Sequence, residues 1–135
     1  MRISTEADYA LRITAYLSEI GIDGRVNSRM VAEKCVITEQ YALKVLHKLL
    51  KGQVVKSFRG IHGGYSIARN PGDITYLEVI ELIDGPLYIN RCLESPSECS
   101  AGVANHCIVH RRLAEVNREM SARLRSYNFD HGTQA

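Results

Sequence analysis

Hydrophobic residues recur at steps of three and four in the first part of the chain, which is the period of an amphipathic helix. Ile13 and Leu17 belong to such a stripe, and it predicts a helix over residues 5–20. A second, short helix is expected over residues 28–34, with Ser28 as its N-cap. The chain therefore opens with two helices in quick succession.

A third helix is predicted to start after Thr38, a good N-cap, and to run to about Lys51. Its apolar positions fall on one side: Ala42, Val45, Leu46, Leu49 and Leu50. Its polar positions align on the opposite side: Gln40, Lys44, His47 and Lys51. Two helices joined by a tight turn form a helix-turn-helix outline, in which the second helix enters a major groove. Taken alone, the polar stripe is equally typical of an ordinary surface helix.

Two strand-like runs follow, over residues 54–59 and 65–69, and a glycine-rich segment separates them. They predict a β-hairpin that carries Arg59 and His62 at its tip. Such a hairpin is a simple turn in many proteins. Directly after a helix-turn-helix outline it indicates the wing of a winged helix, where an arginine can enter a minor groove.

The second half contains two more predicted helices. Thr75 and Glu78 form a capping box before a buried helix that ends at Gly85. A long helix over residues 107–128 carries an apolar stripe, which either docks on its own domain or, as we favour, pairs with a second copy. The expected fold class is mainly α with a small β-hairpin. Its expected parts are a winged-helix DNA-binding domain (1–85), a cysteine-containing loop (86–106), a dimerisation helix (107–128) and a flexible tail (129–135).

Charge is distributed unevenly along the 135 residues. Residues 1–72 hold 11 basic and 6 acidic side chains, whereas residues 73–135 hold 6 and 9. A basic first half suits double-stranded DNA as a partner. The expected DNA contacts are Ser28, Thr38, Glu39, Gln40, Tyr41, Lys44, His47, Lys48, Lys51, Lys56, Arg59, His62 and Gly63.

Other functional classes find little support in the sequence. No segment approaches the length of a bilayer-spanning helix, so we expect a cytoplasmic protein without a membrane partner. No paired acid and base, activated nucleophile or phosphate-binding loop points to an enzyme.

Three cysteines lie just before the long helix: Cys92, Cys99 and Cys107. The segment around them is rich in small polar residues, Pro and Gly, so it packs poorly by itself. In a reducing compartment such cysteines are more typical of metal ligands than of disulfides. A structural zinc site and metal-free redox thiols stay open as alternatives. Cys35, which has apolar neighbours, is interpreted as a core residue.

The sequence resembles a family of winged-helix repressors, typified by the iron–sulfur-cluster assembly regulator and the nitric-oxide-sensing repressor. The matching segments are Met1–Thr5, Asp8–Arg12, Thr38–Tyr41, Val55–Gly60, Gly63–Tyr65, Ile74–Ile80 and the three cysteines. The resemblance implies a homodimer joined by the C-terminal helix, with a 2Fe–2S or 4Fe–4S cluster in each cysteine loop. The chain departs from the pattern in two places. Its gaps of six and seven residues between the cysteines are longer, and Leu43 stands where the assembly regulator has an acidic base-reading side chain.

Three thiolates leave a cluster one ligand short, and the resemblance offers two candidates. His110 follows Cys107 by three positions, as in the assembly regulator. Asp8 matches the carboxylate that some nitric-oxide sensors supply from the partner subunit. A non-thiolate ligand leaves one iron more exchangeable, which suits a sensor.

We therefore expect a dimeric repressor that binds a palindromic operator and responds to nitric oxide, redox state or the supply of iron or clusters. A cluster-free regulator that answers to a small molecule or a protein partner is the first alternative. A thiol-redox or electron-transfer protein is the second, although the basic helix and the wing have no role in it.

Overall fold

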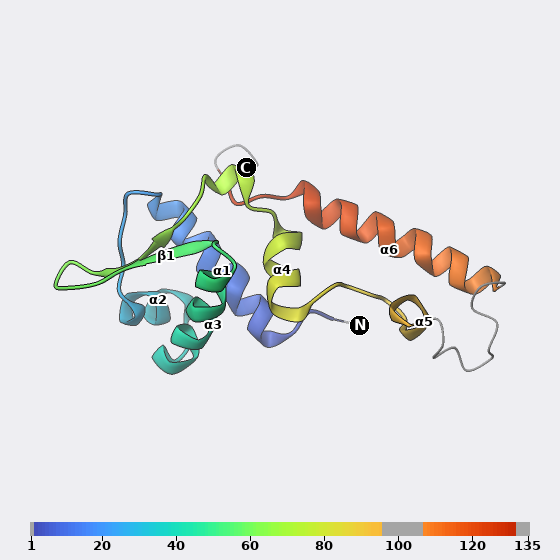
Figure 1. The fold of residues 1–135 in the computed structure, drawn as a ribbon, viewed down its shortest axis with the longest axis horizontal. Helices are drawn as coiled ribbons and strands as arrows, with labels where there is room; N and C mark the ends of the chain where they lie inside the picture. The colour runs from blue at the N-terminus through green and yellow to red at the C-terminus, as the bar shows by residue number, and fades with distance from the viewer. Residues whose placement is uncertain (1, 96–106, 132–135) are drawn as a thin grey trace.

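The computed structural model describes residues 2–95 and 107–131, and these are mostly helical. The helices are α1 (Thr5–Ile20), α2 (Ser28–Cys35), α3 (Glu39–Lys51), α4 (Tyr76–Asp84), α5 (Arg91–Glu94) and α6 (Ile108–Ser126), with a 3-10 turn at Pro71–Asp73. Strands β1 (Val55–Phe58) and β2 (Gly64–Ile67) form an antiparallel hairpin. The predicted fold class is confirmed, and the short helix α5 was not expected (Figure 1).

Side-chain caps set where the first helices begin. Ser4 caps α1 by accepting the backbone N–H of Ala7 at 3.0 Å. The expected cap of α2 was wrong by one residue: Asn27 accepts the Met30 N–H at 2.9 Å, and Ser28 is the first helical residue. Asn27 is the cap because its backbone is extended, as an N-cap requires, whereas the backbone of Ser28 is already helical.

One core joins α1, α2, α3 and the hairpin. Ile13 and Leu17 of α1 are buried against Leu46 and Leu49 of α3. The hairpin closes this core with its base, since its paired residues Val55 and Ile67 are buried, while its tip projects away from the helices (Figure 1). The base of the wing is thus part of the core.

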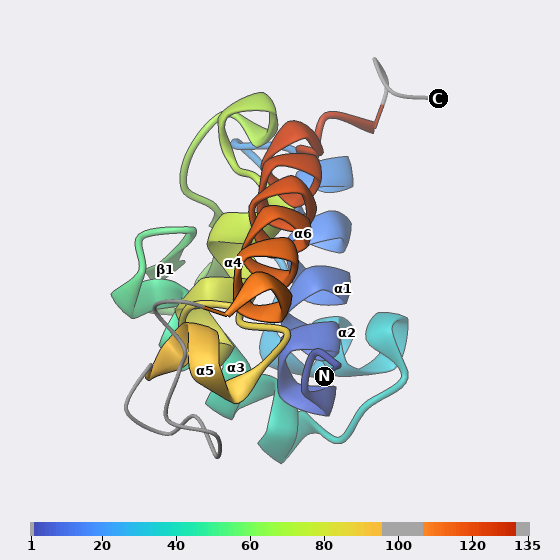
Figure 2. The same cartoon turned by 90° about the vertical axis from the view of Figure 1, so that its right-hand side faces the viewer.

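A second, smaller cluster attaches α6 to the rest of the fold. Leu77 and Ile80 of α4 are buried beside Leu87, and Met120 and Leu124 of α6 pack against them. Figure 2 looks at this side of the molecule and shows α6 lying in front of α4. The first half of α6 extends beyond the cluster (Figure 1) and carries exposed apolar side chains: Ile108, Val109 and Val116.

The chain after α6 returns to the core, which corrects the flexible tail expected from residue 129. Phe129 is 2% exposed, and its ring stacks on Tyr76 with centroids 4.5 Å apart. Its N–H also donates to the Pro71 carbonyl at 3.1 Å. Burial of this aromatic ring removes a large apolar surface from water and so holds the segment against the core. Residues 132–135 lie outside the described residues.

Within residues 2–95 and 107–131, none of the helices combines the length and the apolar character needed to cross a membrane.

Candidate DNA interface and cysteine site

Helix α3 presents one face to the core and a polar face to solvent. Its start is fixed by Thr38, which accepts the Tyr41 N–H at 3.1 Å, as expected. Four of the expected contact residues are exposed along the polar face: Gln40, Lys44, His47 and Lys51. At 3.6 residues per turn they fall within a sector of about 60°. This is the shape of a helix that can enter a major groove.

Other expected contact residues make bonds within the chain. Glu39 accepts a hydrogen bond from the Ser28 hydroxyl at 2.9 Å, which joins the first turns of α2 and α3. The Lys48 ammonium lies 2.7 Å from the Glu6 carboxylate of α1. Lys56 is half-buried on β1. Ser28, Glu39 and Lys48 therefore position the helices, and Lys48 is less available to a phosphate than Lys44.

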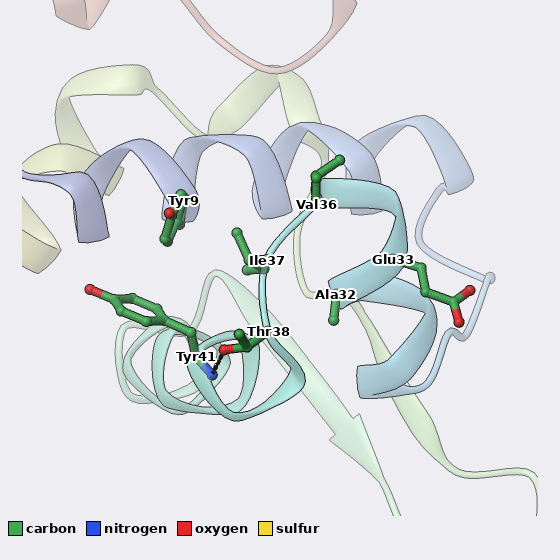
Figure 3. A pocket seen from close by; sticks show the side chains of 7 residues that line it. All are labelled: Tyr9, Ala32, Glu33, Val36, Ile37, Thr38 and Tyr41. Atoms are coloured by element: carbon green, nitrogen blue, oxygen red, sulfur yellow. Dashed lines mark hydrogen bonds between the residues drawn. The ribbon is translucent and has the colours of Figure 1, made fainter.

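Tyr41 lies at the edge of a pocket of about 540 Å³ between α1, α3 and the turn that joins α2 to α3. Figure 3 shows it facing Tyr9 at one end of the pocket, with Val36 at the other. The two rings meet edge to face with centroids 5.1 Å apart. Lys44 stands with its Nζ 5.5 Å from the Tyr41 centroid. The Tyr41 ring thus packs α3 against α1 and lies close to the ammonium group of Lys44.

The tip of the wing is a tight turn that carries Arg59 and His62, both exposed. Gly60 adopts a positive φ of 98°, and the Gly63 N–H donates to its carbonyl at 3.0 Å. A Cβ at Gly63 would lie 2.3 Å from the Phe58 carbonyl oxygen, so glycine is required there. Gly63 shapes the wing, and the two exposed side chains are free to contact DNA.

Arg25 braces the wing from the loop before α2, and the sequence pattern gave no signal for it. Its guanidinium lies 3.6 Å from the centroid of the Phe58 ring and donates to the His62 carbonyl at 3.4 Å. Beside it, Val26 and Tyr65 exchange backbone hydrogen bonds of 3.0 and 2.7 Å. The hairpin is therefore fixed to the helix-turn-helix along its length.

Two apolar side chains are exposed on the elements that are expected to contact DNA. Leu43 on α3 is 43% exposed, and Ile61 at the wing tip is 99% exposed. A glycine-rich turn needs no apolar residue, and Ile61 has no distinctive pattern around it, so it was not predicted as an exposed apolar residue.

The cysteine site brings together parts of α5 and α6. Cys92 lies on α5, and Cys107 is the N-cap of α6; both thiols are free and half-buried. The Nδ1 atom of His110 lies 3.2 Å from the Cys92 sulfur. Donors that share one tetrahedral metal lie about 3.6 Å apart, so this pair fits a common metal with a small adjustment. Cys99 lies outside the described residues, and among those described no three donors gather as a metal site.

Asp8, the other expected ligand, is engaged within its own chain. Its carboxylate lies 2.7 Å from the guanidinium of Arg12, one turn later on α1. Arg12 also donates to the Cys35 carbonyl at 3.4 Å. A single chain therefore pairs Cys92 with His110, and the role of Asp8 toward a partner subunit stays a prediction.

Asn117 of α6 holds the segment that leads into α5. Its side-chain amide donates to the Leu87 carbonyl and accepts the Ile89 N–H, both at 2.9 Å. These two bonds fix the approach to Cys92 against the helix that carries His110. An asparagine in mid-helix is usually a surface residue, so the sequence did not mark it.

Cys35 is a core residue, as the sequence suggested, with 6% of its surface exposed. Burial raises the pKa of its thiol, and the positive charges of Arg12 and Lys34 partly offset this effect. The thiol is therefore held neutral and is poorly suited to redox chemistry.

Comparison with known proteins identifies relatives over nearly the whole chain. The family described as "Rrf2: Iron-dependent Transcriptional regulator" matches residues 3–132. An HTH-type transcriptional regulator of Aquifex aeolicus is 35% identical over 120 residues, which cover 89% of this chain and 83% of the relative.

Solved structures show the same fold. IscR of T. potens superposes with a TM-score of 0.77 at 23% identity, covering 99% of this chain and 87% of that one. CymR, described as the global cysteine regulator of B. subtilis, superposes with a TM-score of 0.72 at 23% identity, covering 96% and 94%. The winged-helix fold is thereby confirmed.

Proposed function

Because this chain belongs to the Rrf2 family of transcriptional regulators, we propose that it is a homodimeric repressor whose affinity for a palindromic operator is set by an iron–sulfur cluster. The observation that carries the proposal is the approach of His110, on α6, to Cys92, on α5, at 3.2 Å. Helix α6 also packs against α4 of the DNA-binding half.

DNA binding is supported by the surface that α3 and the wing form together. Gln40, Lys44 and His47 are exposed on the helix, and Arg59 and His62 at the wing tip. In the proposed complex α3 enters the major groove, and the Arg59 side chain enters the adjacent minor groove. Lysines and arginines that displace counterions supply most of the affinity, so binding falls steeply with salt.

Dimerisation is supported by the first half of α6. Ile108, Val109 and Val116 are each more than half exposed there, on a part of the helix that extends beyond its own core. A second copy would bury these side chains and place two copies of α3 on one face of a duplex.

The donor set fits an iron–sulfur cluster. Cys92 and Cys107 provide thiolates from the start of α5 and α6, Cys99 would provide the third, and His110 is the fourth ligand that we favour. A bound cluster supplies iron that is open to exchange at the imidazole position. The protein holds α5 against α6. A change in that contact would be transmitted to α4 through Leu87, which is buried beside Leu77 and Ile80.

The test uses full-length protein purified without oxygen. Iron and sulfide are counted per chain by native mass spectrometry and absorption, and operator affinity is measured on a duplex selected from a random library. We expect Cys99→Ser and His110→Ala to lose or alter the cluster and to change operator affinity together. Arg111→Ala, an exposed neighbour on α6, serves as the matched control. Colourless, iron-free protein with unchanged operator affinity would refute the cluster.

The second candidate is a cluster-free regulator that answers to a small molecule or a protein partner, and the structural likeness to CymR, described as a global cysteine regulator, favours it. In that case iron would be absent from the anaerobic protein, and Cys92→Ser would leave operator affinity unchanged.

Asp8→Ala distinguishes the two candidates for the fourth ligand within the first proposal. A spectrum altered by Asp8→Ala and untouched by His110→Ala would assign the fourth ligand to the partner subunit.

A further inference from the structure

Leu43 borders the polar face of α3 with an apolar side chain. It is 43% exposed and belongs to neither hydrophobic cluster of the described residues. Ala42 and Val45, its neighbours along the helix, are fully buried, so the core is complete without it. The leucine side chain is therefore available to a partner outside the chain.

Leu43 lies at the edge of the candidate DNA surface on α3, about 40° from His47 around the helix axis. It follows Gln40 by three residues and precedes His47 by four, so the three side chains are neighbours on one face. It also lies in the half of α3 nearer to the N-terminus, the half that approaches base edges in helix-turn-helix proteins. A duplex that contacts Gln40 and His47 therefore comes within reach of the Leu43 side chain.

The charges around Leu43 favour nucleic acid. Lys44 and Lys51 are exposed on the same side of the helix. Glu39, the acidic residue of α3, accepts a hydrogen bond from the Ser28 hydroxyl at 2.9 Å. A phosphate backbone is therefore attracted to the basic face of α3, next to an apolar patch that is one side chain wide.

The apolar group that a duplex offers in its major groove is the C5-methyl of thymine. Resting on the proposed function, we infer that Leu43 contacts one thymine methyl in each half-site and is a specificity-determining residue. The lysines supply affinity for any duplex, whereas this contact distinguishes a methylated pyrimidine from the other bases. A 5-methylcytosine at the same position presents the same group.

The experiment deletes the methyl and the side chain separately. A preferred duplex is selected from a random library with full-length protein, and each thymine in turn is replaced by uracil, which differs by that methyl alone. Affinities are measured for the wild type and for Leu43→Ala. At one thymine per half-site, we expect uracil to weaken the binding of the wild type about four-fold, which is the loss of affinity expected for one buried methyl group. Leu43→Ala should bind thymine and uracil duplexes equally at that position.

A matched control excludes a general effect of removing an exposed apolar side chain. Ile22, in the loop after α1, is 43% exposed, as Leu43 is, and lies outside α3. Ile22→Ala should retain the full thymine preference. Thermal unfolding of both variants confirms that each is folded.

The outcomes separate this inference from the function on which it rests. Equal uracil effects in the wild type and Leu43→Ala, or no uracil effect at any thymine, would overturn the inference and leave the regulator intact. A protein that retains no duplex from the library would overturn the proposed function as well.

Discussion

The carboxylate of Asp84 accepts hydrogen bonds from both the hydroxyl and the backbone N–H of Ser4, the latter at 2.9 Å. Ser4 is the N-cap of α1, and Asp84 is the last residue of α4. The contact therefore joins the start of α1, which packs against α3, to the end of α4, which leads into the segment before the cysteine site.

Replacing Asp84 with asparagine should lower the free energy of unfolding by about 1 kcal/mol, because an amide has one acceptor oxygen for two donors. Urea unfolding of the iron-free protein measures the change. Asp23→Asn, in the exposed loop after α1, is the control and should be neutral. Equal stability of the two variants would show that solvent screens the Asp84 contact completely.

Much of the DNA-binding half could be predicted because its signals are local. Thr38 and Thr75 were identified as N-caps, and each accepts the expected backbone N–H at 3.1 Å. The period of the apolar stripe gave the bounds of α1, Thr5–Ile20, as the structure has them. Helix starts and periodicity depend on residues within a few positions of each other, which a single sequence displays.

The contacts that the sequence did not reveal join distant parts of the chain. Arg25 reaches Phe58, and Asn117 reaches Leu87, and neither arginine nor asparagine is distinctive in its own segment. Phe129 was assigned to a flexible tail because its neighbours are polar, yet its ring is buried. The role of Cys99 lies outside the described residues, so the full ligand set stays a prediction.

The Arg25 brace should control how firmly the wing engages DNA. Phe58→Leu removes the ring over which the guanidinium lies at 3.6 Å and should weaken operator binding by about 0.5–1 kcal/mol. No charge is lost, so the salt dependence of binding should keep its slope. Phe58→Tyr retains the ring and should bind as the wild type does. Fluorescence anisotropy at several salt concentrations checks both expectations, and a changed slope in Phe58→Leu would argue against the brace.

Two lysines of α3 should differ in their contribution to the salt dependence. Lys44 is exposed, and Lys44→Gln should reduce the slope of log affinity against log salt by about 1. Lys48 is neutralised by Glu6 at 2.7 Å, so Lys48→Gln should reduce it much less. Anisotropy titrations over a range of salt concentrations measure both slopes. Equal reductions would mean that the Lys48–Glu6 pair opens on DNA.

Asn117 should determine how long iron is retained. Asn117→Ala removes the two 2.9 Å bonds to the segment before α5 and frees Cys92 to move away from His110. We expect iron release to a chelator to be faster, by roughly ten-fold, as for other residues that orient metal ligands. Arg118→Ala, the exposed neighbour, should release iron at the wild-type rate. Identical rates for Asn117→Ala and the wild type would remove Asn117 from the cysteine site.

The buried Cys35 thiol should make the fold less stable in alkali. Its pKa is raised above the ordinary value of 9.0 by burial, so above that pH the unfolded chain loses the proton more readily than the folded chain. The stabilisation is therefore complete below pH 9.0 and declines as the pH rises toward the folded pKa. Cys35→Ala has no thiol to titrate. The difference in unfolding free energy between the wild type and this variant should therefore shrink above pH 9.0. Urea unfolding at each pH, with reductant present, measures that difference. A difference that is constant across the range would mean that the thiol titrates equally in both states.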